Sequence, residues 1–449
     1  MLMVMEKNVA RAEAPESEDP TAAAEAAVEV PPEIVAQTLG QWFQAWMARI
    51  RAGDSGVLPV ILGLVIITFV FEGISPHQVF LSATNLVNLF QQSAVFMVLA
   101  MGVIFALLLG QIDLSIGFVG ATGAAIAVQL VQPATTKWPW WAAIAAALLV
   151  CALIGAIQGT LIARLRLSSL IVTLAGGLIF NGVMLIVLGL GPFSGYPSLA
   201  GSNANLQVLY NLMWGTINPT VSWVGMVVLV AAAGLIMWSA DNRRRRSGLV
   251  APPVSLTLLK IGLIAVCAVV VVAICNVNRA AIGTLEGVPW VIPIVLAVFT
   301  VWMVLLQKTR FGRYVYAIGG NPEAARRAGV RLANIITLCF TISAFTAGIG
   351  ALLYASNLGG MSNNFPGNSL VLQAIASAVI GGTSLFGGRG KVLHGILGGL
   401  VIGGIYNGMY LLSIPVQWQF IVVGVVLILA VSIDALSRRS ATSGSVARV

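Results

Sequence analysis

The side chains that could perform chemistry in this sequence are single polar groups within long apolar stretches. They are Gln111, Asp113, Gln158, Asn181, Tyr354 and Asn407. Groups of this kind can contact a polar solute, while hydrogen bonds between helices explain Gln158, Asn181, Tyr354 and Asn407 individually as well. We take these six residues as candidates for the lining of a substrate pathway.

Asp113 is the one carboxylate among these candidates. An ionised side chain at the centre of a bilayer costs about 2.5–3.5 kcal/mol on insertion scales, so such a residue is either functional or well capped. In the sequence Asp113-Leu114-Ser115 the carboxylate can accept hydrogen bonds from the free amides that start the next helix, which favours a helix cap. The alternative is a contact with substrate hydroxyls, or a gate.

The sequence contains no catalytic or metal-binding grouping. His77 and His394 are isolated, and the four cysteines fall inside apolar runs without a partner at metal-ligand spacing. Residues 387–391, GGRGK, invite comparison with a phosphate-binding loop, but Val392 stands where Ser or Thr is required and Leu385 where the first Gly is required. We therefore expect no enzymatic activity, no metal, no cofactor and no ATP site in this chain.

The elements that must position the polar candidates are membrane-spanning helices. Hydrophobic residues make up 58% of the 449 residues and charged residues 9%, against roughly 25% charged residues in soluble domains. The apolar runs are continuous and long enough for helices that cross a bilayer, whereas barrel strands alternate. The sequence predicts an all-α integral membrane protein with about twelve transmembrane helices, at residues 57–74, 93–110, 115–132, 140–163, 168–190, 221–239, 255–275, 289–306, 335–355, 370–386, 391–412 and 416–434.

Basic residues between these spans predict the orientation of the chain. With the N-terminus in the cytoplasm, alternation leaves only Lys137 and Arg279 outside, and it places the basic clusters of the other loops inside, as the positive-inside rule requires. Both termini are therefore expected in the cytoplasm. The net charge of +9 is accounted for by these clusters, and we expect no nucleic-acid partner.

Four parts of the chain are distinguished by composition. Residues 1–32 have the Ala-, Glu- and Pro-rich composition of a disordered cytoplasmic tail. Residues 33–52 place apolar side chains on one helical face, which is typical of an amphipathic helix in the membrane interface. Residues 53–436 form the transmembrane domain, and residues 437–449 form a second cytoplasmic tail.

Glycines at every fourth position predict close helix packing. Gly395, Gly399 and Gly403 repeat in one span, and Gly155 with Gly159 in another. Small residues at this spacing let helices approach closely. A role in sliding between conformations is the alternative.

The inner loop of residues 307–334 carries the most informative local pattern. Gly319 and Gly320 are expected to break the chain, Asn321 to cap a short helix with Pro322 in its first turn, and Gly329 to end it. A small, well-capped surface helix is suited to docking in a groove of a soluble partner, and an ordinary connector explains the pattern equally well.

Three segments resemble the permeases of ABC sugar importers of the ribose, xylose and galactose type. They are GQIDLSIG at residues 110–117, YAIGGNPEAARRAGV at residues 316–330 and AIASAVIGGTSLFGGRGKVLHGILGGLVIGGIYNGM at residues 374–409. The first usually reads GGIDLSVG in the family, so Gln111 replaces a common glycine. The resemblance extends from about residue 82 to residue 434 and leaves the N-terminal tail outside.

The resemblance implies a type II ABC importer permease, which is a transport subunit. In this family the EAA-like loop is the coupling helix that docks on a cytoplasmic ATPase, and the matching positions are Gly319, Gly320, Asn321, Glu323, Ala324, Ala325 and Gly329. The implied partners are ATPase subunits that bind ATP and magnesium, an external sugar-binding protein, a second permease chain as a homodimer, and the lipid bilayer. The implied location is a bacterial cytoplasmic (inner) membrane.

The resemblance favours a monosaccharide as the substrate. The span pair within residues 221–275 exceeds the ten-span ribose-type core and is similar to the longer xylose-transport members, which favours xylose or a related pentose or hexose. One alternative is an ion-coupled secondary sugar transporter, for which Asp113 and Glu72 are the available carboxylates. The other is a branched-chain amino-acid permease of the same superfamily.

Overall fold

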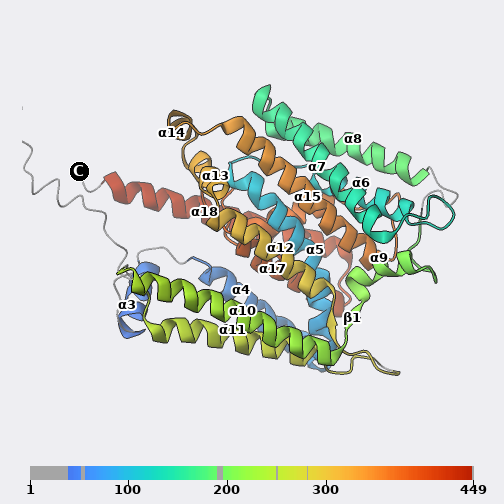
Figure 1. Cartoon of the computed structure of the whole chain (residues 1–449), viewed down its shortest axis with the longest axis horizontal. Helices are drawn as coiled ribbons and strands as arrows, with labels where there is room; N and C mark the ends of the chain where they lie inside the picture. Colours follow the sequence, from blue (N-terminus) through green and yellow to red (C-terminus); the bar gives the residue numbers. More distant parts are fainter. Residues whose placement is uncertain (1–38, 52–55, 190–195, 249–250, 281, 447–449) are drawn as a thin grey trace, which may run out of the picture. The chain divides into compact units, whose positions relative to one another are not determined.

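The computed structural model describes residues 39–51, 56–189, 196–248, 251–280 and 282–446, and these residues are predominantly helical (Figure 1). The elements in chain order are α3 (Leu39–Arg51), α4 (Leu58–Ile74), η1 (Pro76–Gln78), α5 (Ala83–Leu108), α6 (Ile116–Leu130), α7 (Trp140–Arg164), α8 (Ser169–Gly189), α9 (Ala204–Trp214), β1 (Thr216–Ile217), α10 (Pro219–Arg246), α11 (Val254–Cys275), β2 (Val288–Pro289), α12 (Val291–Lys308), α13 (Arg310–Gly320), α14 (Pro322–Arg327), α15 (Leu332–Leu358), α16 (Gly367–Ile380), α17 (Val392–Leu411) and α18 (Val416–Val446).

Twelve apolar helices coincide with the twelve predicted spans. Eight of the described helices are long and apolar enough to cross a membrane, namely α5, α7, α8, α10, α11, α12, α15 and α17. Four shorter apolar helices lie at Leu58–Ile74, Ile116–Leu130, Gly367–Ile380 and Val416–Leu429. The predicted all-α membrane fold is confirmed, with one two-residue antiparallel ladder in which Thr216 faces Pro289 and Ile217 faces Val288.

The chain divides into two compact units. Of the described residues, one contains those within 39–51 and 232–263, and the other contains those within 56–231 and 264–446. The predicted tail of residues 1–32 lies outside the described residues, and α3 is the described part of the predicted interfacial helix at 33–52. Its placement at a membrane surface stays a prediction, as do the domain boundaries.

Helix α5 is the centre of the second unit. Nearly nine-tenths of its apolar window is buried, and it packs against α12, α15, α16 and α17 (Figure 1). Because a central helix has protein on all sides, its breaks and polar groups can be satisfied by neighbours without contact with lipid.

The glycine repeats lie where helices meet, as the sequence predicts. A Cβ atom on Gly399 of α17 would lie 2.7 Å from the backbone nitrogen of Met97 on α5, and one on Gly403 would lie 2.6 Å from Cβ of Ser93. On α7, a Cβ atom on Gly155 would lie 2.4 Å from the carbonyl oxygen of Phe340 on α15. These glycines let the helix backbones touch, so the packing role is confirmed.

Helix α5 begins at Ala83, ten residues before the predicted span at 93–110. The polar residues of its first turns precede the predicted span, but they have buried hydrogen-bond partners. Asn85 donates to the Phe80 carbonyl and to Asn407 Oδ1, each at 2.8 Å, and Gln91 donates to the Met213 carbonyl at 2.8 Å. Polar groups satisfied in this way do not end a helix.

Helix α16 ends at Ile380, several residues before the end of the predicted span at 370–386. Gly382 follows in the left-handed region at φ +108°, a conformation that glycine adopts without strain. The next residues turn back over the end of α5, where they become part of the candidate site.

Candidate functional site

The chain breaks between α5 and α6 at the segment of residues 109–115. Gly110 has φ +71°, and the amides of Gly110 and Gln111 donate to the carbonyls of Leu107 and Ala106. This is a Schellman ending, which needs a left-handed residue after the helix and favours glycine there. The first glycine of the GQIDLSIG segment therefore ends α5 and releases the residues that follow it.

Asp113 is buried and ties this break to two neighbouring elements. Its Oδ1 accepts from the backbone amide of Ser115 at 3.0 Å and from the Ser115 hydroxyl at 2.7 Å. Its Oδ2 accepts from the Ser343 hydroxyl of α15 at 2.9 Å. The hydrogen bond to an amide at the start of the next helix is the one the sequence favours, and the bond to α15 adds a tie between distant segments.

Gln158 of α7 completes this buried polar cluster. Its Oε1 lies 2.9 Å from Ser115 Oγ. The single hydroxyl proton of Ser115 is already directed at Asp113 Oδ1, so it cannot be donated to Gln158 as well. The Nε2 of Gln158 has no partner among the described residues. If the oxygen and nitrogen of the Gln158 amide exchange places, the nitrogen can donate to Ser115 Oγ. The unpaired atom is then the amide oxygen, and a buried acceptor without a partner is less costly than a buried donor without one.

The cluster lies near the end of α5 and near the end of α7. Helix α5 has 26 residues, about 39 Å of helix against a hydrocarbon core of about 30 Å. Helix α5 is therefore longer than the core is thick. Gln158 lies six residues before the end of α7 at Arg164, about 9 Å along the axis.

Four glycines bring the break into contact with two other segments, at a place we call the glycine junction: Gly110, Gly319, Gly387 and Gly388. A Cβ atom on Gly319 would lie 1.9 Å from the Leu108 carbonyl oxygen, and one on Gly387 would lie 2.8 Å from the Gly110 nitrogen. The Gly388 amide donates to the Leu108 carbonyl at 2.9 Å. The three motifs of the sequence analysis thus meet at backbone contact distance.

The GGRGK segment is part of this junction. Gly387 and Gly388 have φ of +88° and +73°, and the Gly388 amide is used inside the protein. His394, which follows it, accepts from the Lys391 amide through Nδ1 and lies 3.2 Å from Thr383 Oγ1. Both features serve the local fold.

The 307–334 loop contains two helices, of which the sequence predicts only the second. Asn321 Oδ1 accepts from the Ala324 amide at 3.0 Å, Pro322 opens α14, and Gly329 follows it at φ +81°. Gly319 and Gly320, expected to break the chain, are instead the last two residues of α13. The break falls at Asn321, and Gly319 is explained by its contact with Leu108.

Tyr316 fixes α13 to the junction. Its hydroxyl donates to the Gly390 carbonyl at 2.7 Å. Burial raises the pKa of this phenol, so it stays a neutral donor at physiological pH. A displacement of α13 would therefore move the residues that hold the end of α5.

Helix α14 presents one exposed side. Pro322, Glu323 and Ala324 are exposed, whereas Ala325 is buried against the protein. Glu323 pairs with Arg326 at 2.8 Å and with Arg327 at 3.6 Å, and exposed pairs of this kind contribute little to stability. The exposed side of α14 is free to meet a partner.

A cleft of about 500 Å³ opens between α14 and the break. Its lining residues are Gln111, Ile162, Ala163, Arg166, Leu167, Pro322, Glu323, Arg326, Leu332, Ala333 and Ile336. Gln111 Oε1 is buried without a hydrogen-bond partner among the described residues. The residue that departs from the usual motif therefore borders an opening on the side of the 307–334 loop.

The structure brings some of the predicted pathway residues together and leaves others apart. Gln111, Asp113 and Gln158 lie at the break. Asn407 accepts a hydrogen bond from Asn85 at 2.8 Å, which joins α17 to α5. Tyr354 packs edge-on against Phe365, with 5.2 Å between the ring centroids. Asn181 is half-buried on α8.

Sequence reasoning missed Ser343 and Tyr316. Ser343 is 230 positions from Asp113 in the chain, and a single serine in an apolar helix carries no signal of its partner. Tyr316 lies within the recognised motif, but its bond to Gly390 depends on the fold of the 381–391 turn.

Comparisons with known proteins give relatives that cover most of this chain. The family described as "Branched-chain amino acid transport system / permease component" matches residues 85–431. The xylose transport system permease protein XylH of Escherichia coli (strain K12) is 32% identical over 381 residues, which cover 85% of this chain and 92% of XylH. XylH of Haemophilus influenzae is 30% identical over 404 residues, covering 88% and 100%.

A relative that is named for ribose is less similar. The ribose import permease protein RbsC of Escherichia coli (strain K12) is 27% identical over 374 residues, which cover 83% of this chain and 92% of RbsC. No solved structure matches this chain at a significant level.

Proposed function

Since this chain belongs to the permease family described as "Branched-chain amino acid transport system / permease component", we propose that it is the membrane-spanning subunit of an ATP-driven importer that carries a monosaccharide into the cell. The proposed driving subunits are cytoplasmic ATPases, which bind ATP and magnesium. The chain itself then carries no cofactor and performs no chemistry.

The observation that carries this proposal is the glycine junction. Helix α14 has an exposed side for a partner, α13 is joined to it at Asn321, and Gly319 of α13 touches the end of α5 at Leu108. Force applied to α14 would reach the break that holds Asp113 through backbone contacts alone. Such a rigid connection suits a subunit that is moved by a separate motor.

The substrate we favour is xylose or a related pentose or hexose. The two XylH relatives are 32% and 30% identical, against 27% for RbsC. The polar groups at the break, Gln111 and Gln158 with Asp113, are amides and a hydrogen-bonded carboxyl, which suit the hydroxyls of a neutral sugar. An external sugar-binding protein would supply most of the recognition.

The remaining partners follow from the same proposal. A second copy of this chain would complete the pore, with both termini on the cytoplasmic side of a bacterial inner membrane. The 307–334 loop would then face the ATPases, and the loop between α8 and α10 would face the external binding protein.

Ion-coupled transport is the second candidate, and Asp113 is the observation in its favour. A coupling carboxylate is expected near the midplane where helices are broken. Asp113 accepts from Ser115 and Ser343, which favours a structural tie. A branched-chain amino-acid substrate, suggested by the family description, would leave the coupling unchanged.

Uptake measurements with several labelled solutes test which one this importer carries. The complete importer would be reconstituted in proteoliposomes and supplied with labelled xylose, ribose, galactose or leucine in the presence of the external binding protein. We expect ATP-dependent uptake of xylose to exceed that of the others. Preferential uptake of leucine would replace the sugar with an amino acid.

The docking role of α14 is tested separately by E323K. This change places three cations at helical spacing, destabilises α14 by roughly 0.2–0.5 kcal/mol per like-charge pair, and makes the exposed surface of α14 more positive. We expect normal membrane insertion and weaker co-purification of the ATPase. Equal recovery of the ATPase with the variant and the parent would remove the assignment of this loop.

A further inference from the structure

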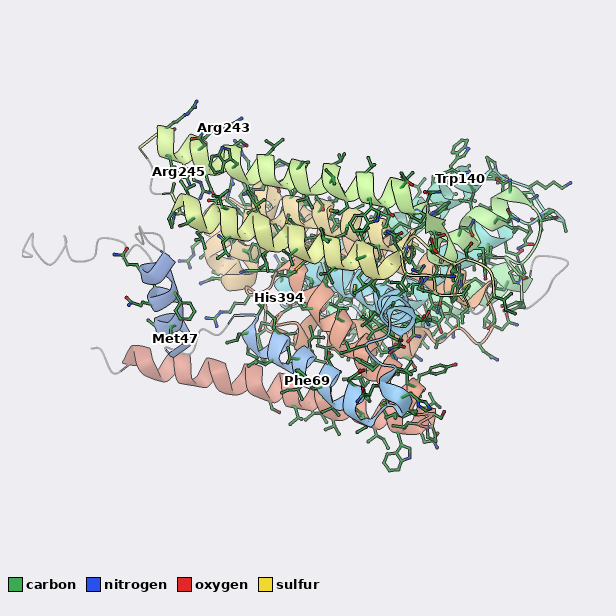
Figure 2. The ribbon with its side chains drawn as sticks, turned by 90° about the horizontal axis from the view of Figure 1, so that it is seen from below. Met47, Phe69, Trp140, Arg243, Arg245 and His394 are labelled. Carbon is green, nitrogen blue, oxygen red and sulfur yellow. The ribbon has the colours of Figure 1, made fainter. Side chains whose placement is uncertain are left out.

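Four consecutive arginines, Arg243 to Arg246, end α10, and they divide into two kinds. Arg245 holds the turn between α10 and α11, because it donates to the Pro252 carbonyl at 2.9 Å and lies over the Trp238 ring at 5.9 Å. Arg243, Arg244 and Arg246 are exposed. Among the described residues these three have no hydrogen bond or ion pair (Figure 2 labels Arg243 and Arg245).

The local carboxylate does not neutralise these arginines. Asp241 accepts from the Thr257 hydroxyl at 2.8 Å. Four arginines and one aspartate give a net charge of 4 − 1 = +3 at the turn, and Lys260 on α11 raises it to +4. The end of α10 itself favours cations, because the carbonyls of a helix C-terminus are partly negative.

The surroundings of the cluster place it at a lipid surface. The apolar windows of α10 and α11 are each only 11% buried, so their side chains are available to lipid. Trp238 is 39% exposed one turn before the arginines, and tryptophan prefers the headgroup level. Lys260 is exposed within an apolar helix, where its flexible stem lets the ammonium reach toward the same level.

We propose that Arg243, Arg244 and Arg246, with Lys260, form a binding site for the headgroup phosphate of an anionic phospholipid. Guanidinium groups bind phosphate oxygens through paired hydrogen bonds, and juxtamembrane arginines contribute about 1 kcal/mol each near an anionic surface. A role in orientation explains cations at this end, but orientation is set by charge count and predicts no preference between lipids. The site is independent of the transported solute.

Native mass spectrometry of the purified full chain, titrated with phosphatidylglycerol or phosphatidylcholine, tests the site. We expect phosphatidylglycerol to bind the parent more tightly, and R243Q/R244Q to weaken that binding by about fivefold per arginine. The matched control is K137Q/R164Q, which removes two exposed cations at the ends of α7 and should bind as the parent does. Arg245 is left intact because it holds the turn.

A second variant separates charge from folding. R243K/R244K keeps the cations and should retain most of the lipid preference. Equal phosphatidylglycerol binding by R243Q/R244Q and the control would overturn the proposal. Displacement of the lipid by an equal concentration of inorganic phosphate would also overturn it, because the site would then recognise a free anion.

Discussion

The side chain that Gly319 lacks decides how closely α13 can approach α5. A Cβ atom there would lie 1.9 Å from the Leu108 carbonyl oxygen, an overlap that a backbone contact cannot relieve by a rotamer change. Overpacking of this kind costs about 1–3 kcal/mol. At the scale of single residues, the link between the loop and the break therefore depends on the absence of one carbon atom.

G319A is expected to lower the thermal unfolding temperature of the purified protein and to reduce ATP-driven uptake. The neighbouring substitution G320A is the matched control for stability, because nothing lies within 4 Å of a Cβ atom at Gly320. Unfolding of both variants followed in detergent would compare them directly. If G319A and G320A unfold at the same temperature, Gly319 does not touch α5 as described.

Asp113 is expected to act through its hydrogen bonds and to need no charge. In D113N the side-chain oxygen can still accept from Ser115, and the Ser343 hydroxyl can turn to accept from the new amide nitrogen. We expect D113N to stay within about 1 kcal/mol of the parent in stability and to keep most of its uptake. D113A would lose both ties and cost about 1–3 kcal/mol, because the Ser115 amide would be left buried and unpaired.

Uptake by D113N decides between the two kinds of coupling. Both variants would be tested for unfolding first, so that a loss of folding is not mistaken for a loss of transport. A folded D113N protein without transport would show that the charge is required, which is the behaviour expected of an ion-coupled carrier.

At the scale of elements, the contact of α17 with α5 depends on glycines that leave no room for a side chain. G399V is expected to destabilise the protein by about 1–3 kcal/mol, since its first side-chain carbon would lie 2.6 Å from Met97 Cγ and 2.7 Å from the Met97 nitrogen. G404A on the same helix is the control, because the nearest atom, on Ile67, would be 3.6 Å away. Chemical unfolding of both variants would measure the difference, and equal stabilities would contradict the described packing.

The positions of the spans could be predicted from the sequence because apolar runs of membrane length have few alternatives. The glycine repeats on α7 and α17 were predictable for the same reason, since their spacing matches a helix face. The start of α5 could not be predicted, because Asn85 and Gln91 look like loop residues until their partners Asn407 and Met213 are known.

The other features that could not be predicted from the sequence depend on contacts between distant segments. The motif around Asp113 indicated a cap, but Ser343 lies on α15 and carries no signal of its own. Helix α13 was missed because Gly319 and Gly320 normally weaken a helix, and only the approach of Leu108 explains why a glycine is required there.

At the scale of the whole molecule, the break between α5 and α6 is connected to α14, the helix that we propose docks on an ATPase. The break at residues 109–115, the turn at 381–391 and the helix pair α13 and α14 meet at the glycine junction. A carrier driven by an ion gradient has no need of such a connection, whereas a subunit driven from outside depends on it.

The source of energy for uptake tests this account most directly. Proteoliposomes containing the chain, with its ATPase and external binding protein, would be supplied with labelled xylose under ATP alone, or under an imposed proton or sodium gradient alone. The account predicts uptake with ATP and none with either gradient. Accumulation driven by an ion gradient in vesicles that lack the ATPase would contradict it.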